Sequence, residues 1–286
     1  MEKTMADARE TIDGFIEKQI SARREEPQGR TPPPNNLEKE AEAEGIDLLS
    51  LYMQYENKDE MAHLKSPKTF LRDTIMSMMA AGTDTTSGAL TWFFWLLSQN
   101  PFVEAKILQE LTSIPNPNPT TNKQPRVFNS EDLGGLVYLH AALCECLRLY
   151  PPVPIIRKRV VATDHLPSGH RVEPGMDIFY SHYAPARMEK IWGKDCLEFR
   201  PERWISEQGV ITFDHTDKFM VFNVGPRSCL GKDVSFTQMK AVVAAVLYNF
   251  QLQVLRDHVV APKIAVVLQM ENGLMVKVRE RAVAAA

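Results

Sequence analysis

FNVGPRSCLG, residues 222–231, places a lone cysteine in a loop of glycine and proline just before a segment of helical periodicity. The Cys229 thiol therefore faces the unpaired N–H groups and the positive end of a helix. Arg227 adds a fixed positive charge nearby. Both features favour the thiolate, the form of cysteine that attacks or binds metal. Gly225 and Gly231 let the backbone approach a large group closely.

This loop alone leaves several uses of Cys229 open. A buried free cysteine in a capping loop is common. A catalytic thiol and a single-cysteine metal ligand are alternatives, and thiolate ligation of haem iron is a known use of one cysteine. The rest of the chain has to decide among them.

The composition excludes several classes of protein. The chain has 286 residues, of which 44% are hydrophobic, enough for a large core. A net charge of -3 without a dense basic stretch argues against a nucleic-acid partner. The four cysteines, at positions 144, 146, 196 and 229, form neither a disulfide framework nor a CxxC zinc motif, and they fit a reducing compartment. The polar N-terminus carries no signal peptide.

The first half of the chain is predicted to be helical. An apolar stripe of Ile12, Phe15, Ile16 and Ile20 marks the first helix. Residues 74–97 have few charges, but Asp84 at their centre disfavours a membrane span, and we expect a helix buried through a core. Two stretches rich in proline and polar residues are linker-like, 23–45 and 112–130. The expected helices are 1–21, 46–56, 67–98, 102–111 and 138–150.

The second half changes to a β pattern. A helix is expected at 183–191, an irregular segment at 199–204, and a long helix at 231–248 after the cysteine loop. Asn272-Gly273 is predicted to form a hairpin turn between two strands. The expected strands are 155–161, 171–180 with a turn at 173–175, 251–254, 263–269 and 274–278. The chain is thus predicted to be mainly α with small β-sheets.

Two further motifs need an explanation. Ala81–Thr86, with sequence AGTDTT, places poor helix formers inside a long helix, which indicates either a kink, a close helix crossing or a function. Glu145 and Arg148 lie three residues apart on one helix face. They form either an exposed ion pair of little energy or a buried pair that requires further partners.

Four elements, in this order, resemble the C-terminal part of a cytochrome P-450, a haem-thiolate monooxygenase. The cysteine loop matches F-x-x-G-x-R-x-C-x-G, and residues 81–86 match [AG]-G-x-[DE]-T-[TS]. Glu145 and Arg148 match E-x-x-R, and residues 201–203 match P-E-R. The resemblance extends from Pro67 to Gly273. The detailed sequence of residues 90–97 and 222–233 is similar to that of the plant fatty-acid ω-hydroxylases and alkane hydroxylases.

The resemblance implies a role for each residue of the loop. Cys229 is expected to be the axial thiolate ligand of haem iron, where its electron donation favours O–O cleavage. Backbone N–H groups of the loop, which includes Gly225 and Gly231, are expected to moderate the charge on the sulfur. Phe222 is expected to pack beside the sulfur, and Arg227 to pair with a haem propionate. The partner of the second propionate is expected to be either Arg159 or Arg157.

The resemblance also implies roles away from the loop. Asp84 and Thr85 are expected to lie above the haem, with Thr85 holding water in a widened helical turn and Asp84 relaying protons. Glu145, Arg148 and Arg203 are expected to form a buried structural network. Five positions are candidates to line the substrate pocket, although each also fits core packing: Met78, Ala81, Ile155, Ile156 and Leu274.

The implied reaction is the NADPH-dependent hydroxylation of an unactivated C–H bond in a hydrophobic substrate, such as a fatty acid or alkane-like molecule. A separate NADPH-cytochrome reductase is expected to supply electrons, with Lys232 and Lys240 as candidates for its docking. One alternative is an inactive remnant with weak or no haem binding. Another is a thiol-redox or haem-sensing protein, against which Asp84 and Thr85 argue, because a sensor needs no proton relay.

The sequence is expected to form a single, N-terminally truncated domain over residues 1–286. Full-length members of the family carry a membrane anchor, most of the first sheet and a helix that contacts a propionate, and this chain is expected to lack them. Full-length relatives are expected at the endoplasmic reticulum membrane, on its cytosolic face. Without the anchor, this chain is expected in the cytosol.

Overall fold

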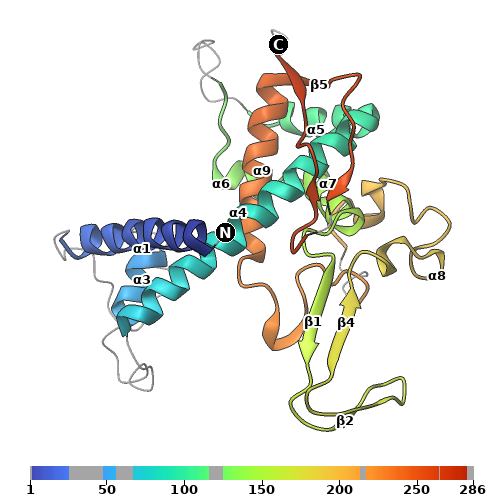
Figure 1. The fold of residues 1–286 in the computed structure, drawn as a ribbon. Helices are drawn as coiled ribbons and strands as arrows, with labels where there is room; N and C mark the ends of the chain where they lie inside the picture. The colour runs from blue at the N-terminus through green and yellow to red at the C-terminus, as the bar shows by residue number, and fades with distance from the viewer. Residues whose placement is uncertain are drawn as a thin grey trace. The chain divides into compact units, whose positions relative to one another are not determined.

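The computed structural model describes residues 2–25, 48–55, 67–115, 125–212, 217–263 and 265–281 (Figure 1). Contacts between Cα atoms divide the chain into two compact units, Met1–Thr83 and Asp84–Ala286. The division falls within one long helix, α4 (Pro67–Gln99).

The smaller unit contains α1 (Glu2–Glu25), α3 (Leu48–Tyr55) and the first part of α4. Its core consists of Ile16, Ile20 and Leu71, which are all buried. Ile16 and Ile20 come from the predicted apolar stripe, whose spacing of four residues places them on one face of α1. Phe15 is the exception to the prediction, since it lies off this face and its side chain is 51% exposed.

Three helices of the larger unit pack against one another: α5 (Pro101–Thr112), α7 (Val137–Leu149) and α9 (Lys232–Asn249). The short helix α6 (Ser130–Gly134) packs against α9. Residues 141–149 of α7 are all buried, which is typical of a helix surrounded by protein on every side. Shorter turns follow α7 in the chain: η2 (Pro185–Arg187), α8 (Glu189–Trp192), η3 (Pro201–Trp204) and η4 (Gly225–Arg227).

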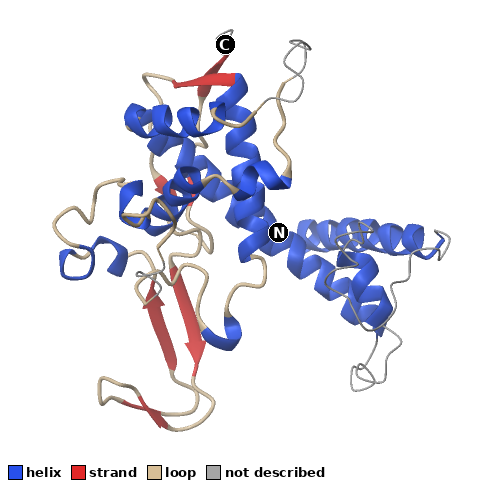
Figure 2. Ribbon diagram, turned by 180° about the vertical axis from the view of Figure 1, so that it is seen from behind, coloured by secondary structure: helices blue, strands red, loops and turns tan. Residues whose placement is uncertain are grey.

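The strands of the described residues form small antiparallel pairs rather than one extended sheet (Figure 2). The mainly helical fold with small sheets that the sequence predicts is therefore confirmed. The pairs are β1 (Ile155–Arg159) with β4 (Asp177–Ser181), β2 (Asp164–His165) with β3 (Arg171–Val172), β5 (Phe250–Val254) with β8 (Val276–Glu280), and β6 (Pro262–Lys263) with β7 (Gln269–Met270).

The predicted hairpin at Asn272-Gly273 is wrong. A turn is present, because Gly273 has a φ of 63° and its N–H donates to the Met270 carbonyl at 3.1 Å. The strands on its two sides have different partners, however, since β7 pairs with β6 and β8 with β5. The predicted strand at 263–269 is also wrong, because the Leu268 N–H and carbonyl bind the Pro152 carbonyl and the Trp92 indole instead of a neighbouring strand.

Other predicted element boundaries differ from those in the structure. The first helix continues to Glu25, so the linker-like stretch begins inside α1, and the rest of that stretch lies outside the described residues. Residues 116–124 of the second linker-like stretch also lie outside them. The helix expected at 183–191 is only η2 and α8. None of the described helices has the length and hydropathy needed to cross a membrane.

Candidate functional site

The cysteine loop is held by short-range hydrogen bonds and by one aromatic anchor. The Cys229 N–H donates to the Phe222 carbonyl at 2.7 Å, which closes the loop over η4. Gly225 opens η4 with a φ of 73°, a left-handed conformation that favours glycine. The Phe222 ring is half-buried and lies 5.3 Å from the Phe236 ring of α9. The loop therefore has a fixed base and a free outer face.

The outer face of the loop is apolar and exposed. Cys229 is the exposed cysteine, whereas Cys144, Cys146 and Cys196 are buried. Leu230 beside it is 83% exposed. A Cβ atom built on Gly225 or Gly231 would meet nothing within 4 Å, so there is open space above the backbone. One accessible thiol surrounded by exposed apolar side chains fits a large flat apolar group that takes a single thiolate ligand. The loop leads into the start of α9 in both views (Figures 1 and 2).

The arginines predicted to serve the propionates have different surroundings. Arg227 ends η4 with its side chain exposed, and within the described part of the chain no carboxylate forms an ion pair with it. Arg157 and Arg159 both bind Asp177, at 2.7 Å and 3.2 Å, because they are two residues apart on β1 and the register places Arg159 opposite Asp177. These hydrogen bonds, that of Arg157 first, lower the pKa of Asp177. Of the three arginines, only Arg227 has no acidic partner here.

The widened turn predicted around Thr85 is not present. Helix α4 is α-helical from Pro67 to Gln99, and the hydroxyl-rich motif does not interrupt it. The hydroxyl groups are accommodated by bonds to the helix's own backbone: Thr83 Oγ1 donates to the Met79 carbonyl at 2.7 Å, and Thr91 Oγ1 to the Ser87 carbonyl at 2.8 Å. Asp84 is exposed and Thr85 is half-buried.

A second set of predicted residues forms one buried network. Glu145 is 0% exposed and accepts hydrogen bonds from Arg148 Nε at 2.8 Å and Arg203 Nε at 2.8 Å. Arg148 is 1% exposed and also donates to the carbonyl oxygens of Ala186 and Cys196. The structure thus brings Glu145, Arg148 and Arg203 together, and it satisfies each buried charge with several partners.

Sequence reasoning missed three members of this network. Trp204 Nε1 donates to Glu145 Oε2 at 2.9 Å, and the backbone N–H of Arg200 donates to Glu145 Oε1 at 3.1 Å. The Asp195 carboxylate lies 3.2 Å from Arg203 and 2.7 Å from Arg200. The hydrogen bond from Arg200 is the main cause of the lowered pKa of Asp195. The tryptophan directly after the P-E-R residues was the available signal, because a buried indole N–H needs an acceptor.

An aromatic layer connects the loop to α7. Phe222 packs on Phe236, and Phe236 stacks on His140 with a centroid separation of 4.3 Å. Burial, and then the charges of Lys240 and Lys232, lower the pKa of His140 to about 4. Lys240 is 8% exposed and its Nζ donates to the Leu133 carbonyl at 2.9 Å. The predicted role of Lys240 in docking a partner is therefore wrong, because α6 covers it. Lys232 is exposed.

The candidates for lining a substrate pocket fall in both units. Met78 and Ala81 belong to the smaller unit, where Met78 is half-buried and Ala81 is exposed. Ile155 and Ile156 lie on β1, and Ile155 is 53% exposed. Leu274 is half-buried against the main core of the larger unit. The apolar side chains on β1 are consequently accessible, whereas Leu274 serves packing.

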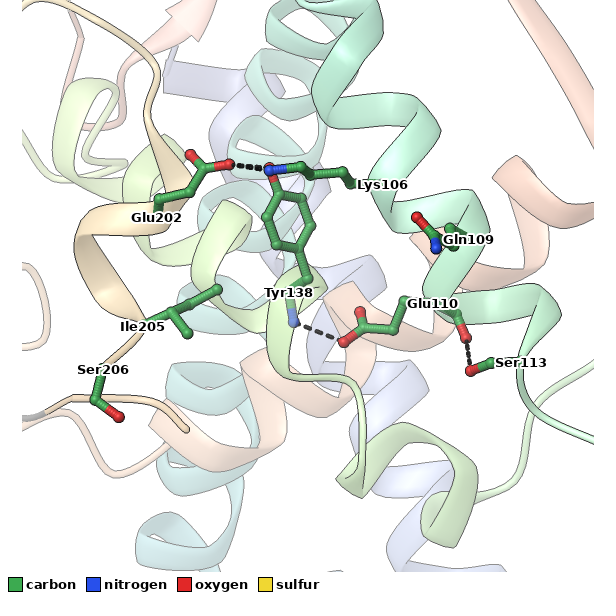
Figure 3. A pocket seen from close by; sticks show the side chains of 8 residues that line it. All are labelled: Lys106, Gln109, Glu110, Ser113, Tyr138, Glu202, Ile205 and Ser206. Atoms are coloured by element: carbon green, nitrogen blue, oxygen red, sulfur yellow. Dashed lines mark hydrogen bonds and ion pairs between the residues drawn. The ribbon is translucent and has the colours of Figure 1, made fainter. Parts of the chain in front are cut away.

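A polar cavity of about 620 Å³ lies between α5, the start of α7 and η3 (Figure 3). Its charges are paired with one another: Lys106 Nζ lies 2.7 Å from Glu202, and the Tyr138 hydroxyl donates to the same carboxylate at 2.8 Å. Glu110 accepts the first N–H groups of α7, from Tyr138 and Leu139. These bonds join η3 to α5 and α7, so the cavity wall supports the segment that carries Arg203.

The exposed Cys229 thiol thus precedes the long helix α9, and the same unit contains the buried network of Glu145, Arg148 and Arg203. The cytochrome P450 family model matches residues 1–278, and the chain belongs to this family. The structure is similar to a crystal structure of a cytochrome P450, CYP102L1, with a TM-score of 0.77 and 21% identity over 98% of this chain and 57% of that one.

Plant proteins of the family show higher identity. Noroxomaritidine synthase 2 of Narcissus aff. pseudonarcissus MK-2014 is 46% identical over 83% of this chain and 45% of its own length. Alkane hydroxylase MAH1 of Arabidopsis thaliana is 40% identical over 98% of this chain and 52% of its own length. Cytochrome P450 86B1 of the same plant is 41% identical over 99% and 49%. The chain thus spans about half the length of the curated relatives it matches.

Proposed function

We propose that this chain provides the haem-binding half of a monooxygenase that hydroxylates a C–H bond of a hydrophobic substrate. The observation that carries the proposal is the loop 222–231, which presents one exposed thiol on an apolar face while its base is anchored by Phe222. A thiol needed only for packing would be buried, as the other three cysteines of the chain are.

Haem iron supplies the oxygen chemistry when the group is bound. The chain's own residues hold and orient the group. Cys229 Sγ would supply the thiolate ligand, and the exposed Leu230 would cover apolar surface beside it. Arg227, which has no acidic partner among the described residues, would offer its guanidinium to one propionate. Arg157 and Arg159 share Asp177, so a second propionate would have to compete with that carboxylate.

Asp84 and Thr85 are proposed to deliver protons. Asp84 is exposed, so its carboxylate is in contact with water. Thr85 is half-buried on the next position of α4, and its hydroxyl can accept a proton from one side and donate to the other. Thr85→Ala should raise the hydrogen peroxide released per NADPH consumed, and Thr86→Ala, a change of the same size one residue away, should not. Equal release from both variants would contradict the role of Thr85.

The substrate is proposed to be long and apolar, of the fatty-acid or alkane type. The name of alkane hydroxylase MAH1 supports this class, and its match covers nearly the whole chain. The name of noroxomaritidine synthase 2 points to a different product. Incubation of the reconstituted protein with an alkane and with a fatty acid, followed by product analysis, tests the class. Conversion of neither would contradict it.

Electrons are proposed to come from NADPH through a reductase that docks on the side of the cysteine loop. Exposed Lys232, three residues after Cys229, is the remaining lysine candidate there. Because an exposed charge acts mainly on association, Lys232→Glu should slow reduction at low salt, with a smaller effect at high salt.

The test of the proposal is a reduced carbon-monoxide difference spectrum of the full chain loaded with haem. We expect a Soret band at the position that thiolate ligation gives. Cys229→Ser should abolish it, whereas Cys144→Ser, which alters a buried thiol, should keep it. If the wild-type chain folds but gives no such band, the chain is an inactive remnant with weak or no haem binding. If Cys229→Ser keeps the band, the ligand is another residue.

A further inference from the structure

A second pocket lies where α4 and α7 end. It has a volume of about 360 Å³ and lies entirely within the larger unit, apart from the cysteine loop. Trp95 and Tyr150 form one side of it, and Tyr183, Arg187 and Phe199 come from the segments that follow β4. It thus combines four aromatic side chains with one cation.

The cation of this pocket is Arg187. The Arg187 guanidinium is half-buried, and burial lowers its pKa. Within the described ranges no Asp or Glu forms an ion pair with Arg187, whereas the buried Arg148 and Arg203 both bind Glu145. A partly desolvated charge without a partner is unfavourable, and an anion placed beside it relieves that cost.

Arg187 keeps donors available for such an anion. Its Nη1 donates to the Tyr183 carbonyl at 3.3 Å, and the guanidinium carbon lies 5.3 Å from the centre of the Tyr150 ring. A guanidinium has five N–H donors, so this hydrogen bond does not use all of them. The carbonyl-rich ends of α4 and α7 stabilise the cation and weaken an anion at the same place, so we expect modest affinity.

The aromatic walls are already in position. Tyr150 stacks on Trp92 with a centroid separation of 4.3 Å and an interplanar angle of 10°. Trp95 meets Tyr150 edge-on at 5.7 Å, and the Arg187 guanidinium lies 3.6 Å from the centre of the Tyr183 ring. Rings held by one another lose little freedom when a ligand binds. Such walls favour a flat apolar body over a flexible chain.

We propose that this pocket binds a small carboxylate with a flat aromatic body, its carboxylate on Arg187 and its ring among Trp95, Tyr150 and Tyr183. The volume is in the lower range of small-molecule sites, which suits a body of one or two rings. Arg187 provides the planar, bidentate geometry that a carboxylate prefers. The site does not involve Cys229, so it can be tested without haem and stands independently of the proposed monooxygenase activity.

The experiment is an isothermal titration calorimetry measurement, in which the full chain is titrated with 2-naphthoate and, separately, with its neutral analogue 2-naphthamide. We expect 2-naphthoate to bind at least about 10-fold more tightly than the amide, because only the carboxylate forms a charge-assisted bond. Arg187→Gln should remove this preference. Arg187→Lys should keep part of it, since the charge remains and the bidentate geometry is lost. Arg157→Gln, a change at an exposed arginine on β1, should leave binding unchanged.

Circular dichroism would show whether Arg187→Gln folds. If it does not, the comparison of the two ligands on the wild-type chain still tests the proposal. Equal affinity of the wild-type chain for naphthoate and naphthamide would overturn the proposal. So would a preference for naphthoate that survives in folded Arg187→Gln, or one that Arg157→Gln abolishes. No binding of either compound would overturn it as well.

Discussion

The Glu145 network and the Cys229 loop differ in the burial and bonding of their functional groups. The Glu145 carboxylate is fully buried and accepts bonds from Arg148, Arg203 and Trp204. The Cys229 thiol is exposed, and its loop is fixed by a backbone bond to Phe222 and by the packing of that ring. In the Glu145 network the polar groups form their hydrogen bonds within the protein. In the loop the Cys229 sulfur remains accessible to a ligand.

The difference indicates which of the motif residues are structural. A charge network that is satisfied from all sides has no capacity left for a ligand, so its role is to fix η3 against α7. An exposed thiol on an apolar loop is unfavourable for folding alone and points to a bound group.

Glu145→Ala should lower the free energy of unfolding by about 3–5 kcal/mol, because it leaves the buried Arg148 without its counter-charge and removes one of the two carboxylates that bind Arg203. Urea unfolding of the full chain, followed by circular dichroism, measures the change. Glu207→Ala removes a carboxylate at an exposed turn and should change it by no more than about 0.5 kcal/mol. A similar effect of both variants would mean that the network is not a structural centre.

Gly225→Ala should destabilise the loop by about 1–2 kcal/mol, because a φ of 73° is unfavourable for a residue with a Cβ atom. Gly231→Ala is the matched control. Its φ is -90° and a new Cβ would meet nothing within 4 Å, so the folded chain without haem should tolerate it. Urea unfolding compares the two. If Gly231→Ala proved the more harmful of the two, backbone conformation would not be what fixes the loop.

His140, which lies between the loop and the core, should make stability depend on pH. Its pKa is lowered to about 4 in the folded chain, against 6.5 for an unperturbed histidine. Between these values the unfolded chain binds more protons, so stability is fully present above pH 6.5 and falls as the pH decreases towards 4. Allowing for partial exposure, we expect a loss of about 1 kcal/mol.

His140→Phe should remove this part of the pH dependence while keeping the stack on Phe236. His165→Gln, at an exposed position of β2, should leave it unchanged. Unfolding curves at pH 4.5 and pH 7 give the comparison. A slope in His140→Phe equal to that of the wild type would assign the dependence to other groups.

Asp177→Asn should have the smallest effect, below about 1 kcal/mol, since its ion pairs with Arg157 and Arg159 are exposed to water. Whatever effect exists should decrease with added salt. Urea unfolding at low and high salt tests this. A loss as large as that of Glu145→Ala would remove the distinction between buried and exposed charge.

The sequence was most informative for residues whose spacing along the chain places them on the same face of a helix. Glu145 and Arg148 share a helix face, and their apolar neighbours indicated burial, so the network could be anticipated. Its completion by Trp204 and the Arg200 backbone could not, because tertiary packing of η3 on α7 brings them in. Lys240 looked like a surface lysine for the same reason: only the fold places α6 over it.

Local patterns failed where distant segments take over backbone hydrogen bonds. Residues 263–269 have the composition of a strand, yet Leu268 binds Pro152 and Trp92 instead of a neighbouring strand. Asn272-Gly273 is a good turn, but pairing of β8 with β5 is a contact over more than twenty residues. The prediction of a mainly helical fold was correct despite these errors, because it rests on long amphipathic segments such as α7 and α9.

The most direct test of the central claim is thiol labelling of the folded chain, with and without haem, read by mass spectrometry. A maleimide should label Cys229 quickly and the buried Cys144, Cys146 and Cys196 only after unfolding. Saturation with haem should then protect Cys229. Rapid labelling of Cys229 that is unaffected by bound haem would contradict the assignment of this thiol as the haem ligand.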